Sequence, residues 1–534
     1  MRIEQVPYSE LRLFDGILPD YVSDYARLSG YYTANPAEAD DLRRRAEAAL
    51  SRKRPREAAA RALDEYNRRL GAGEETPANI AKLRGEDCAA VVTGQQPGLF
   101  GGPLYTVYKA MTAIRLARLF DEDLGVPCVP VFWNASDGHD AGEYASITMP
   151  GRDGRPTRRR LRDIPGFASA FDVEVTRECR DLLNEYCSSL PETEFSAEVV
   201  ETLKSAYEGN LAESFSRLML GLFSRHGLIL MEPRLLRREA AGIIAREIKT
   251  RGESSASIRE AKRSLKEKGY TPPFTGEEEV KAFIYEGKRR RRIRASEGGF
   301  SSREREYSTG EILELVESEP ERFSPDAALR PIVQDALLPT AAYVAGPTET
   351  AYFAQLKKAY EFFDVPMPAI YPRVSATLVE AKIARLLANF NIVAKGFLNG
   401  ARPQDNVENA EGNNGLEKEF AAMLDEMERR LKRLRGMALK YEPTLEKPFD
   451  RSERSIRREL EKLRDRAASA RLNRLGTGRR QRLRVGDALL PGGKPQERVY
   501  TMWPWLCKYG VELTDGLLER LPFQEFHHTL IYFG

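Results

Sequence analysis

The chain has 534 residues, of which 31% are charged, yet its formal net charge is only +3. A length well beyond the ~100–200 residues of a typical domain predicts more than one domain. So balanced a charge argues against a protein that binds nucleic acid or a membrane surface through its overall charge. The N-terminus lacks the layout of a signal peptide, and no run approaches the ~18 apolar residues of a membrane span.

The five cysteines, spread from Cys88 to Cys507, form no CxxC pair. This spacing offers no structural zinc site, and four histidines leave few other metal ligands. An odd, scattered set of thiols is typical of a reducing compartment. The sequence therefore predicts a soluble cytoplasmic protein with no metal site of its own.

The first part of the chain predicts a charged helix followed by a βαβ unit. Residues 36–70 place apolar side chains on one helical face, with a break at Pro55. Residues 88–93 are an apolar, β-branched run typical of a buried parallel strand, and residues 127–133 predict a second strand. Between them lie a glycine- and proline-rich loop, residues 94–103, and an apolar helix. This order places the loop at the carboxyl end of the first strand.

Changes of pattern divide the chain into five segments. The initial α/β pattern gives way to basic stretches and amphipathic helices, then returns with an apolar strand at 341–345. Further on, two highly charged stretches repeat apolar residues with four-three spacing, which predicts an antiparallel coiled-coil hairpin. We expect a core (first part) at 1–150, connecting insertions at 151–325, the second part of the core at 326–404, the hairpin at 405–482 and the C-terminal part of the core at 483–534.

The loop at 94–102 is the first candidate site. Its glycines allow backbone N–H groups to approach an anion, and the following helix adds the positive end of its dipole. The spacing matches neither the GxGxxG fingerprint nor the P-loop. The loop therefore either binds a nucleotide or phosphate, or simply forms a tight turn from strand to helix.

The segment after the second strand is the second candidate. Asp137, His139 and Asp140 follow a strand end, where parallel sheets bind their ligands. His139 could act as an acid or base, and Asp137 or Asp140 could bind an ammonium group or Mg²⁺. The alternative is a turn in which these side chains cap local backbone groups. The scarcity of histidine in the chain favours a functional site.

Two further loops carry residue types suited to binding. Gly346 and Glu349 follow another predicted strand, where Glu349 could bind substrate or simply complement the helix dipole. The late loop 492–498 contains Lys494 and could close over phosphates, or could remain a solvated loop.

The remaining polar motifs favour structural interpretations. The basic run 288–294 lies beside an apolar segment, and a solvated strand or hairpin is favoured over an anion or nucleic-acid site. His226 and the pair His527 and His528 are interpreted as structural, although the pair could line the crevice of the core.

Several of these strings together resemble one family. They are TGQQPGLFGGPLYTVYK from Thr93 to Lys109, PVFW ending at Trp133, DGHD from Asp137 to Asp140, GPTETAY from Gly346, the pair Pro372-Arg373, and GKPQER ending at Arg498. In this order they resemble the bacillithiol biosynthesis cysteine-adding enzymes along essentially the whole chain. The first string alone is long and unusual, so the resemblance is specific.

The resemblance implies a Rossmann-like α/β parallel-sheet core related to class I aminoacyl-tRNA synthetases, with connecting insertions and a coiled coil used for homodimerisation. It implies a ligase that joins L-cysteine to glucosaminyl malate with ATP, with ADP as a species that could be found bound and Mg²⁺ as a companion ion. The chain has no HIGH-type histidine pair in its glycine loop and no KMSKS string, so an adenylate and an acyl phosphate both stay open as the activated intermediate.

We expect catalytic residues after the second strand and binding residues around it. The expected catalytic residues are Asp137, His139 and Asp140. The expected nucleotide- or substrate-binding residues are Gly94, Gln95, Gln96, Gly98, Gly101, Lys109, Trp133, Gly346, Glu349, Arg373 and Lys494.

Two other classes of protein stay open. One is a nucleotide- or RNA-binding protein without ligase activity, which would use the basic insertion. The other is a coiled-coil scaffold whose core binds a metabolite only as a regulator.

Overall fold

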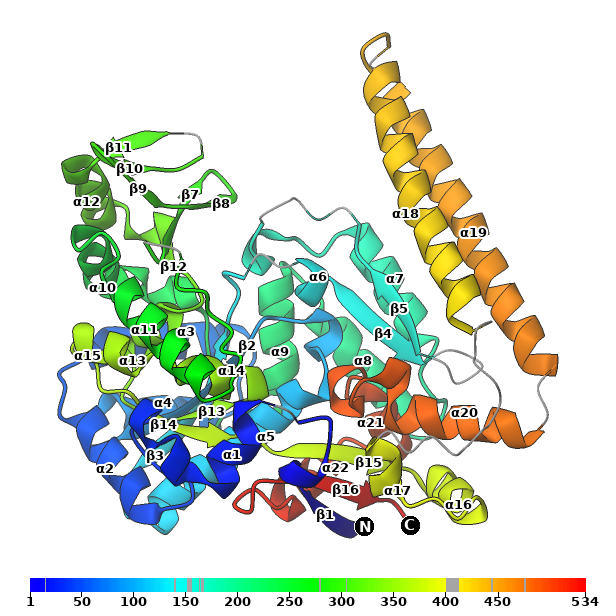
Figure 1. Ribbon diagram of the computed structural model, residues 1–534, viewed down its shortest axis with the longest axis horizontal. Helices are drawn as coiled ribbons and strands as arrows, with labels where there is room; N and C mark the ends of the chain where they lie inside the picture. The colour runs from blue at the N-terminus through cyan, green and yellow to red at the C-terminus, as the bar shows by residue number, and fades with distance from the viewer. Residues whose placement is uncertain are drawn as a thin grey trace.

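A computed structural model describes most of the chain. The described residues are 1–14, 16–138, 141–150, 156–162, 164, 168–277, 280–303, 305–399, 413–442, 445–474 and 477–534. Figure 1 shows a broad α/β body from which one long helical hairpin projects.

The body is built on a five-stranded sheet in which every neighbouring pair is parallel. The predicted βαβ unit is present as a strand, a helix that begins directly after the glycine loop, and a second strand. The sheet order is β14-β13-β2-β3-β6, with β2 at Ala89–Gln95, β3 at Cys128–Asn134, β6 at Ile229–Met231, β13 at Thr340–Ala345 and β14 at Ala369–Pro372.

Helices cover both faces of this sheet, which explains why its strands are largely apolar. Along β2, Ala89 and Val91 pack into the hydrophobic cluster of the helix α5, Leu104–Glu122. The alternate residues Ala90 and Val92 pack into a second cluster on the opposite face, formed with helices from both halves of the chain. That second layer includes α3, Arg56–Arg69, α4, Glu75–Arg84, and α13, Arg330–Leu337.

The N-terminal region and the second half of the core agree with the sequence in outline. The helix predicted at 36–70 is split at Pro55 into α2, Ala39–Leu50, and α3, as expected from the missing N–H of proline. After β13 there are two short helices, α14 at Pro347–Phe353 and α15 at Lys357–Phe362. A short helix, α1 at Ile17–Ser23, packs against α14.

The two ends of the chain meet in a second sheet. The strand order is β1-β16-β15, with β1 at Arg2–Pro7, β15 at Ser375–Val379 and β16 at His527–Tyr532. The tail therefore packs back onto the body, as the sequence predicted. His528 lies buried in β16 between Ser375 and Thr377, and burial lowers its pKa to about 4, so it is neutral at neutral pH and structural. The helices of this region are α16 at Ala381–Asn389, α17 at Ala394–Leu398, α20 at Thr477–Leu489, α21 at Trp503–Tyr509 and α22 at Leu513–Arg520.

The range 151–325 is not purely insertion, because it contains the core strand β6. Only three residues long, β6 is too short to show a periodic pattern in the sequence. One insertion therefore lies between β3 and β6, and another between β6 and β13. The first holds α6 at Ala141–Tyr144, β4 at Ser146–Pro150, β5 at Pro156–Arg160, α7 at Arg177–Cys187, α8 at Ser196–Ala206 and α9 at Leu211–Phe223.

The second insertion carries two small antiparallel sheets. One has the order β12-β7-β8 and the other β11-β10-β9. Its elements are α10 at Arg237–Lys249, α11 at Ser254–Glu267, β7 at Ala282–Glu286, β8 at Arg289–Arg292, β9 at Arg294–Ser296, β10 at Gly299–Ser301, β11 at Glu306–Ser308, α12 at Thr309–Ser318 and β12 at Phe323–Pro325.

The projecting hairpin consists of α18, Asn413–Ala438, and α19, Glu446–Arg474. Leu424 is buried between the two helices, and Arg457 forms an ion pair with Glu428 across them. The predicted coiled coil is therefore present, although α20, which begins inside the expected range, packs against α16 in the body. No helix of the described part of the chain has both the length and the apolar character that a membrane span needs.

Candidate active site

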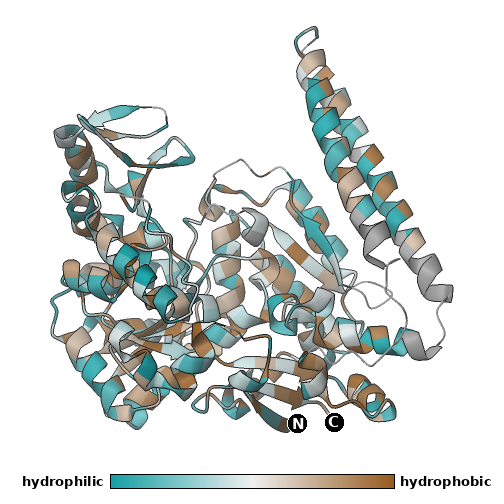
Figure 2. Ribbon diagram, viewed as in Figure 1, coloured by the Kyte–Doolittle hydropathy of each residue, from teal (hydrophilic) through white to brown (hydrophobic). Residues whose placement is uncertain are grey.

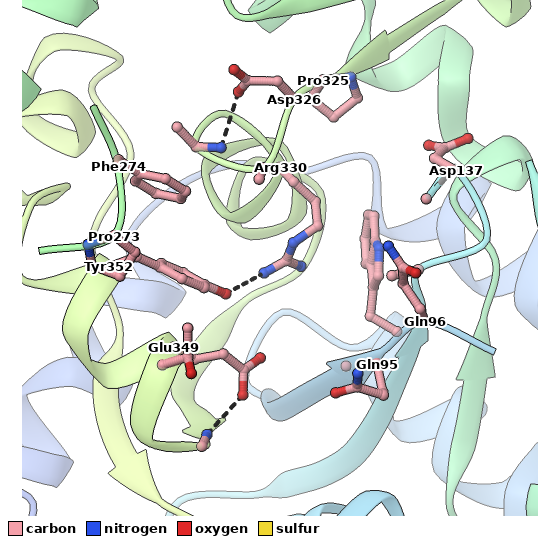
Figure 3. A pocket seen from close by; sticks show the side chains of 18 of the residues that line it. Gln95, Gln96, Asp137, Pro273, Phe274, Pro325, Asp326, Arg330, Glu349 and Tyr352 are labelled. Carbon is pink, nitrogen blue, oxygen red and sulfur yellow. Dashed lines mark hydrogen bonds between the residues drawn. The ribbon is translucent and has the colours of Figure 1, made fainter. Parts of the chain in front are cut away.

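A pocket of about 710 Å³ lies at the carboxyl ends of the core strands, where parallel sheets bind ligands. Residues following β2, β3 and β13 line one side, and the second insertion lines the other. Figure 3 shows Asp137 across the pocket from Phe274 and Tyr352, with Arg330 between them.

The pocket gathers most of the residues expected from the sequence. Gly98, Gly101 and Lys494 do not line it, and His139 and Asp140 lie outside the described residues. The expected residues that do line it are Gly94, Gln95, Gln96, Lys109, Trp133, Asp137, Gly346, Glu349 and Arg373.

The glycines of the loop after β2 have packing reasons of their own. A Cβ on Gly98 would lie 2.8 Å from Gly102 Cα, so the loop closes tightly on itself at this point. Gly101 has φ +85°, a conformation that other residues rarely adopt. The far part of the loop is therefore a tight turn from strand to helix, and only its first residues, Gly94 to Gln96, face the pocket.

Lys109 holds two strand ends together beneath the pocket. Its buried ammonium donates to the Gly94 carbonyl at 2.7 Å and to Gln95 Oε1 at 3.0 Å, and it pairs with Glu349 at 2.5 Å. Burial lowers the pKa of Lys109, and Glu349 partly offsets this. Glu349 also accepts from the Gly346 N–H. These contacts give Lys109 and Glu349 a clear role in positioning the pocket wall.

Asp137 links the core to the second insertion. Its carboxylate accepts hydrogen bonds from the Arg237 guanidinium and from the Tyr285 hydroxyl, the latter at 3.1 Å. Arg237 begins α10, and Tyr285 lies on β7. Since a buried carboxylate is costly unless it is paired and hydrogen-bonded, these two partners fix the loop after β3 against the insertion.

Glu232 lies directly behind this loop, at the end of β6. It is buried, accepts a hydrogen bond from Ser136 Oγ, and accepts a second from the Arg234 N–H at 2.9 Å. Burial raises its pKa to about 7, and the nearby Asp137 charge adds to the effect. Sequence analysis missed Glu232 because its strand was itself missed.

Arg373 is buried and paired. It donates through Nη1 and Nη2 to Glu497 at 3.1 and 2.6 Å, and Glu497 also accepts from Ser375 and the Ala376 N–H. The motif at 493–498 thus contributes a structural carboxylate. Its Arg498 lines the pocket, whereas Lys494 lies exposed on the preceding turn.

The second insertion supplies pocket residues that the sequence did not identify. Phe274 stacks on Tyr352 with ring centroids 5.1 Å apart. The buried Gln355 side chain accepts a hydrogen bond from the Phe274 N–H and donates one to the Phe274 carbonyl, both at 2.9 Å.

The basic run at 288–294 forms the predicted hairpin, but two of its arginines face the pocket. In the sequence, only the alternation of side chains along a strand indicated that these two arginines would share one face. The further charged residues of this wall are Lys281, Arg290, Arg292, Asp326 and Arg330.

The charge of the pocket suits an anionic ligand. Among the described residues it is lined by seven Lys or Arg side chains and by three Asp or Glu side chains. The buried indole Nε1 of Trp133 and Oε1 of Gln96 have no hydrogen-bond partner within the described residues. In that same part of the chain, no three His, Cys, Asp or Glu side chains gather as a metal site would require.

A parallel sheet covered on both faces, with a charged pocket at its strand ends, defines a Rossmann-like α/β protein. Comparison with known families agrees. The model of the N-terminal Rossmann-like domain of bacillithiol biosynthesis BshC matches residues 1–374, and that of the C-terminal coiled-coil domain of BshC matches residues 376–533. The chain therefore belongs to the BshC family.

Curated relatives span the whole chain. One from Symbiobacterium thermophilum is 33% identical and covers 100% of both chains. One from Salinibacter ruber is 31% identical over 99% of this chain and 98% of its own. One from Chlorobaculum tepidum is 35% identical over 88% of this chain and 87% of its own. Each carries the name "Putative cysteine ligase BshC".

The raised pKa of Glu232 predicts a pH-dependent stability. Between its ordinary pKa of 4.5 and about 7, the folded chain keeps a proton that the unfolded chain releases. The contribution of Glu232 to the free energy of unfolding is thus fully present below pH 4.5. As the pH rises through 7, this contribution, on the order of 3 kcal/mol, is lost. Glu232→Gln should therefore match the parent at pH 5 and unfold at higher urea concentration than the parent at pH 8.

Urea midpoints measured from pH 5 to pH 8 test this. Taking the difference between variant and parent cancels other titrations, such as the low-pH effect of His528. The exposed Glu192→Gln is the control and should follow the parent throughout. A Glu232→Gln profile parallel to the parent would show that Glu232 is ionised in the folded protein at all these pH values.

Proposed function

We propose that the protein is a ligase that joins L-cysteine to glucosaminyl malate through an amide bond, using ATP. The observation that carries this proposal is the cation-rich pocket at the strand ends, in a chain that belongs to the BshC family. The name cysteine ligase, borne by full-length relatives, supports the reaction type.

The chemistry requires an activated carboxyl and a neutral amine, because a free carboxylate and an ammonium group do not condense at useful rates. The Asp137 side chain lines the pocket and is held by Arg237 and Tyr285, so it can orient the amine of the sugar. The cations that line the pocket stabilise negative charge as it develops on the reacting groups.

The residues present fit a nucleotide. ATP, when bound, supplies the energy that activates the cysteine carboxyl, and Mg²⁺ would accompany its phosphates. Backbone groups of Gly94 to Gln96 at the end of β2 and the cations of the pocket are suited to hold it. All five cysteines are free thiols, which suits a cytoplasmic location. The basic run that would have supported RNA binding turns two of its arginines to the pocket instead.

A mass-spectrometric assay with cysteine, glucosaminyl malate and ATP tests the proposal directly. The parent protein should form bacillithiol, and Asp137→Asn should lower turnover by roughly a hundredfold, the scale of one well-placed polar catalytic group. The matched control is the exposed Asp364→Asn, because Asp364 has φ 54° and asparagine tolerates that conformation. Melting curves should show that all three proteins are folded.

Absence of product from the folded parent protein would overturn the proposed reaction. If the parent is active and Asp137→Asn forms bacillithiol at the parent rate, Asp137 only holds the loop in place.

We also propose that the protein is a homodimer through the hairpin. Several large apolar side chains of the described part of the hairpin are exposed, and Figure 2 shows hydrophobic and hydrophilic residues alternating along both of its helices. A second copy would cover them, as in other coiled coils. The exposed residues are Met423, Leu434, Met437, Tyr441, Ile456 and Leu463.

Replacing residues 413–474 with a short Gly-Ser linker should give a folded monomer in sedimentation experiments. Among the described residues, the two-helix arm meets the body at the pair Arg162 and Glu461, 3.9 Å apart, so the body should fold without the arm. A deletion protein that sediments as a dimer would place the interface on the body.

A further inference from the structure

The hairpin formed by β7 and β8 presents two arginines to the pocket in a fixed arrangement. Phe283 on β7 is paired with Arg292 on β8, and Tyr285 with Arg290. Because side chains alternate along a strand, Phe283 and Tyr285 share one face of β7, and Arg290 and Arg292 share one face of β8. Phe283, Arg290 and Arg292 all line the pocket.

Both guanidinium groups lie against the Phe283 ring. The Arg290 guanidinium carbon is 4.0 Å from the centre of the Phe283 ring, and that of Arg292 is 4.6 Å from it. Stacking on an aromatic face restricts a guanidinium group without using its N–H donors. The pair is therefore oriented before any ligand binds.

Polar contacts fix the pair further. Arg290 donates to Ser324 Oγ at 2.9 Å and to the Pro325 carbonyl at 2.5 Å. The buried Nη1 of Arg292 forms an ion pair with Asp326 at 3.6 Å, but no acceptor among the described residues lies within hydrogen-bond distance of it. Figure 3 shows Pro325 and Asp326 on the same side of the pocket. A buried guanidinium N–H without an acceptor indicates a ligand oxygen at this place.

This wall is joined to the strand ends by Tyr285. On the same face of β7 as Phe283, the Tyr285 hydroxyl donates to Asp137. A small molecule bound at the arginines therefore reaches toward Asp137, where the proposed function places the amine.

We propose that Arg290 and Arg292 bind the dicarboxylate end of the amino-sugar substrate and so set the specificity of the enzyme for the malate group. This inference rests on the proposed function, because it assigns a subsite for one of its substrates. Arg292 can donate N–H groups to one carboxylate, and the positive charge of Arg290 beside it favours a second.

Arginines bind phosphate groups as well as carboxylates, so the experiment must distinguish the malate group from the phosphates of ATP. The location favours the dicarboxylate. The arginines lie on the insertion, whereas the proposed function places the phosphates at the end of β2, where the backbone groups of Gly94 to Gln96 face the pocket.

Calorimetry and initial-rate kinetics on the full chain test this subsite. Arg292→Gln should weaken glucosaminyl malate binding and raise its KM by about 10- to 100-fold, the loss expected for hydrogen bonds to a charged group. The KM values for ATP and cysteine should stay within about twofold of the parent. Methyl glucosaminide, which lacks malate, should bind parent and variant equally. The exposed Arg294→Gln, outside the pocket, is the matched control.

Arg290→Lys provides a second variant, because it keeps the positive charge at a buried position and removes the planar group that stacks on Phe283 and donates to Ser324 and Pro325. It should show the same selective loss of malate binding. A rise in the KM for ATP instead would assign the arginines to phosphates and overturn the proposal, and so would unchanged affinity in both variants. If the parent binds glucosaminyl malate but forms no product, the proposed reaction fails while the subsite is still tested by the binding data.

Discussion

The site depends on one buried carboxylate that joins two parts of the chain far apart in sequence. Asp137 follows β3 of the core, and its partners Arg237 and Tyr285 belong to the second insertion. A buried carboxylate must be compensated, so the loop and the insertion cannot separate without leaving charge unpaired. That requirement brings the wall with Arg290 and Arg292 over the strand ends and turns a sheet edge into a pocket.

Two further buried ion pairs hold the floor of this pocket. Lys109 and Glu349 connect the segments after β2 and β13, and Arg373 and Glu497 connect the end of β14 to the C-terminal region. In each pair the charges also bond to backbone or hydroxyl groups, as stable buried pairs require. The charged residues nearest the strand ends thus act first as positioning groups. The cations on the insertion are the stronger candidates for contact with an anionic substrate.

Much of the fold could be predicted because its signals are local. The alternation of apolar strands with a glycine loop gave the βαβ unit, and the four-three repeats gave the hairpin. Strand β6 could not be predicted, because three apolar residues carry no period. Its absence from the prediction also concealed Glu232.

The site could be predicted only where it follows the strand ends. Gly94, Asp137 and Glu349 were found because each lies within a few residues of the end of a predicted strand. The arginines of the run at 288–294 were assigned to a solvated hairpin, because sequence does not show which face of a hairpin meets another part of the chain. Arg373 and Glu497 are 124 residues apart, so only the folded chain shows that they neutralise each other.

The most direct test is a crystal structure of the full chain with glucosaminyl malate bound. The account predicts the malate carboxylates within hydrogen-bond distance of Arg290 and Arg292, and the sugar amine turned toward Asp137. Glucosaminyl malate bound outside this pocket, or with its carboxylates at the Gly94 to Gln96 segment and its amine away from Asp137, would contradict it.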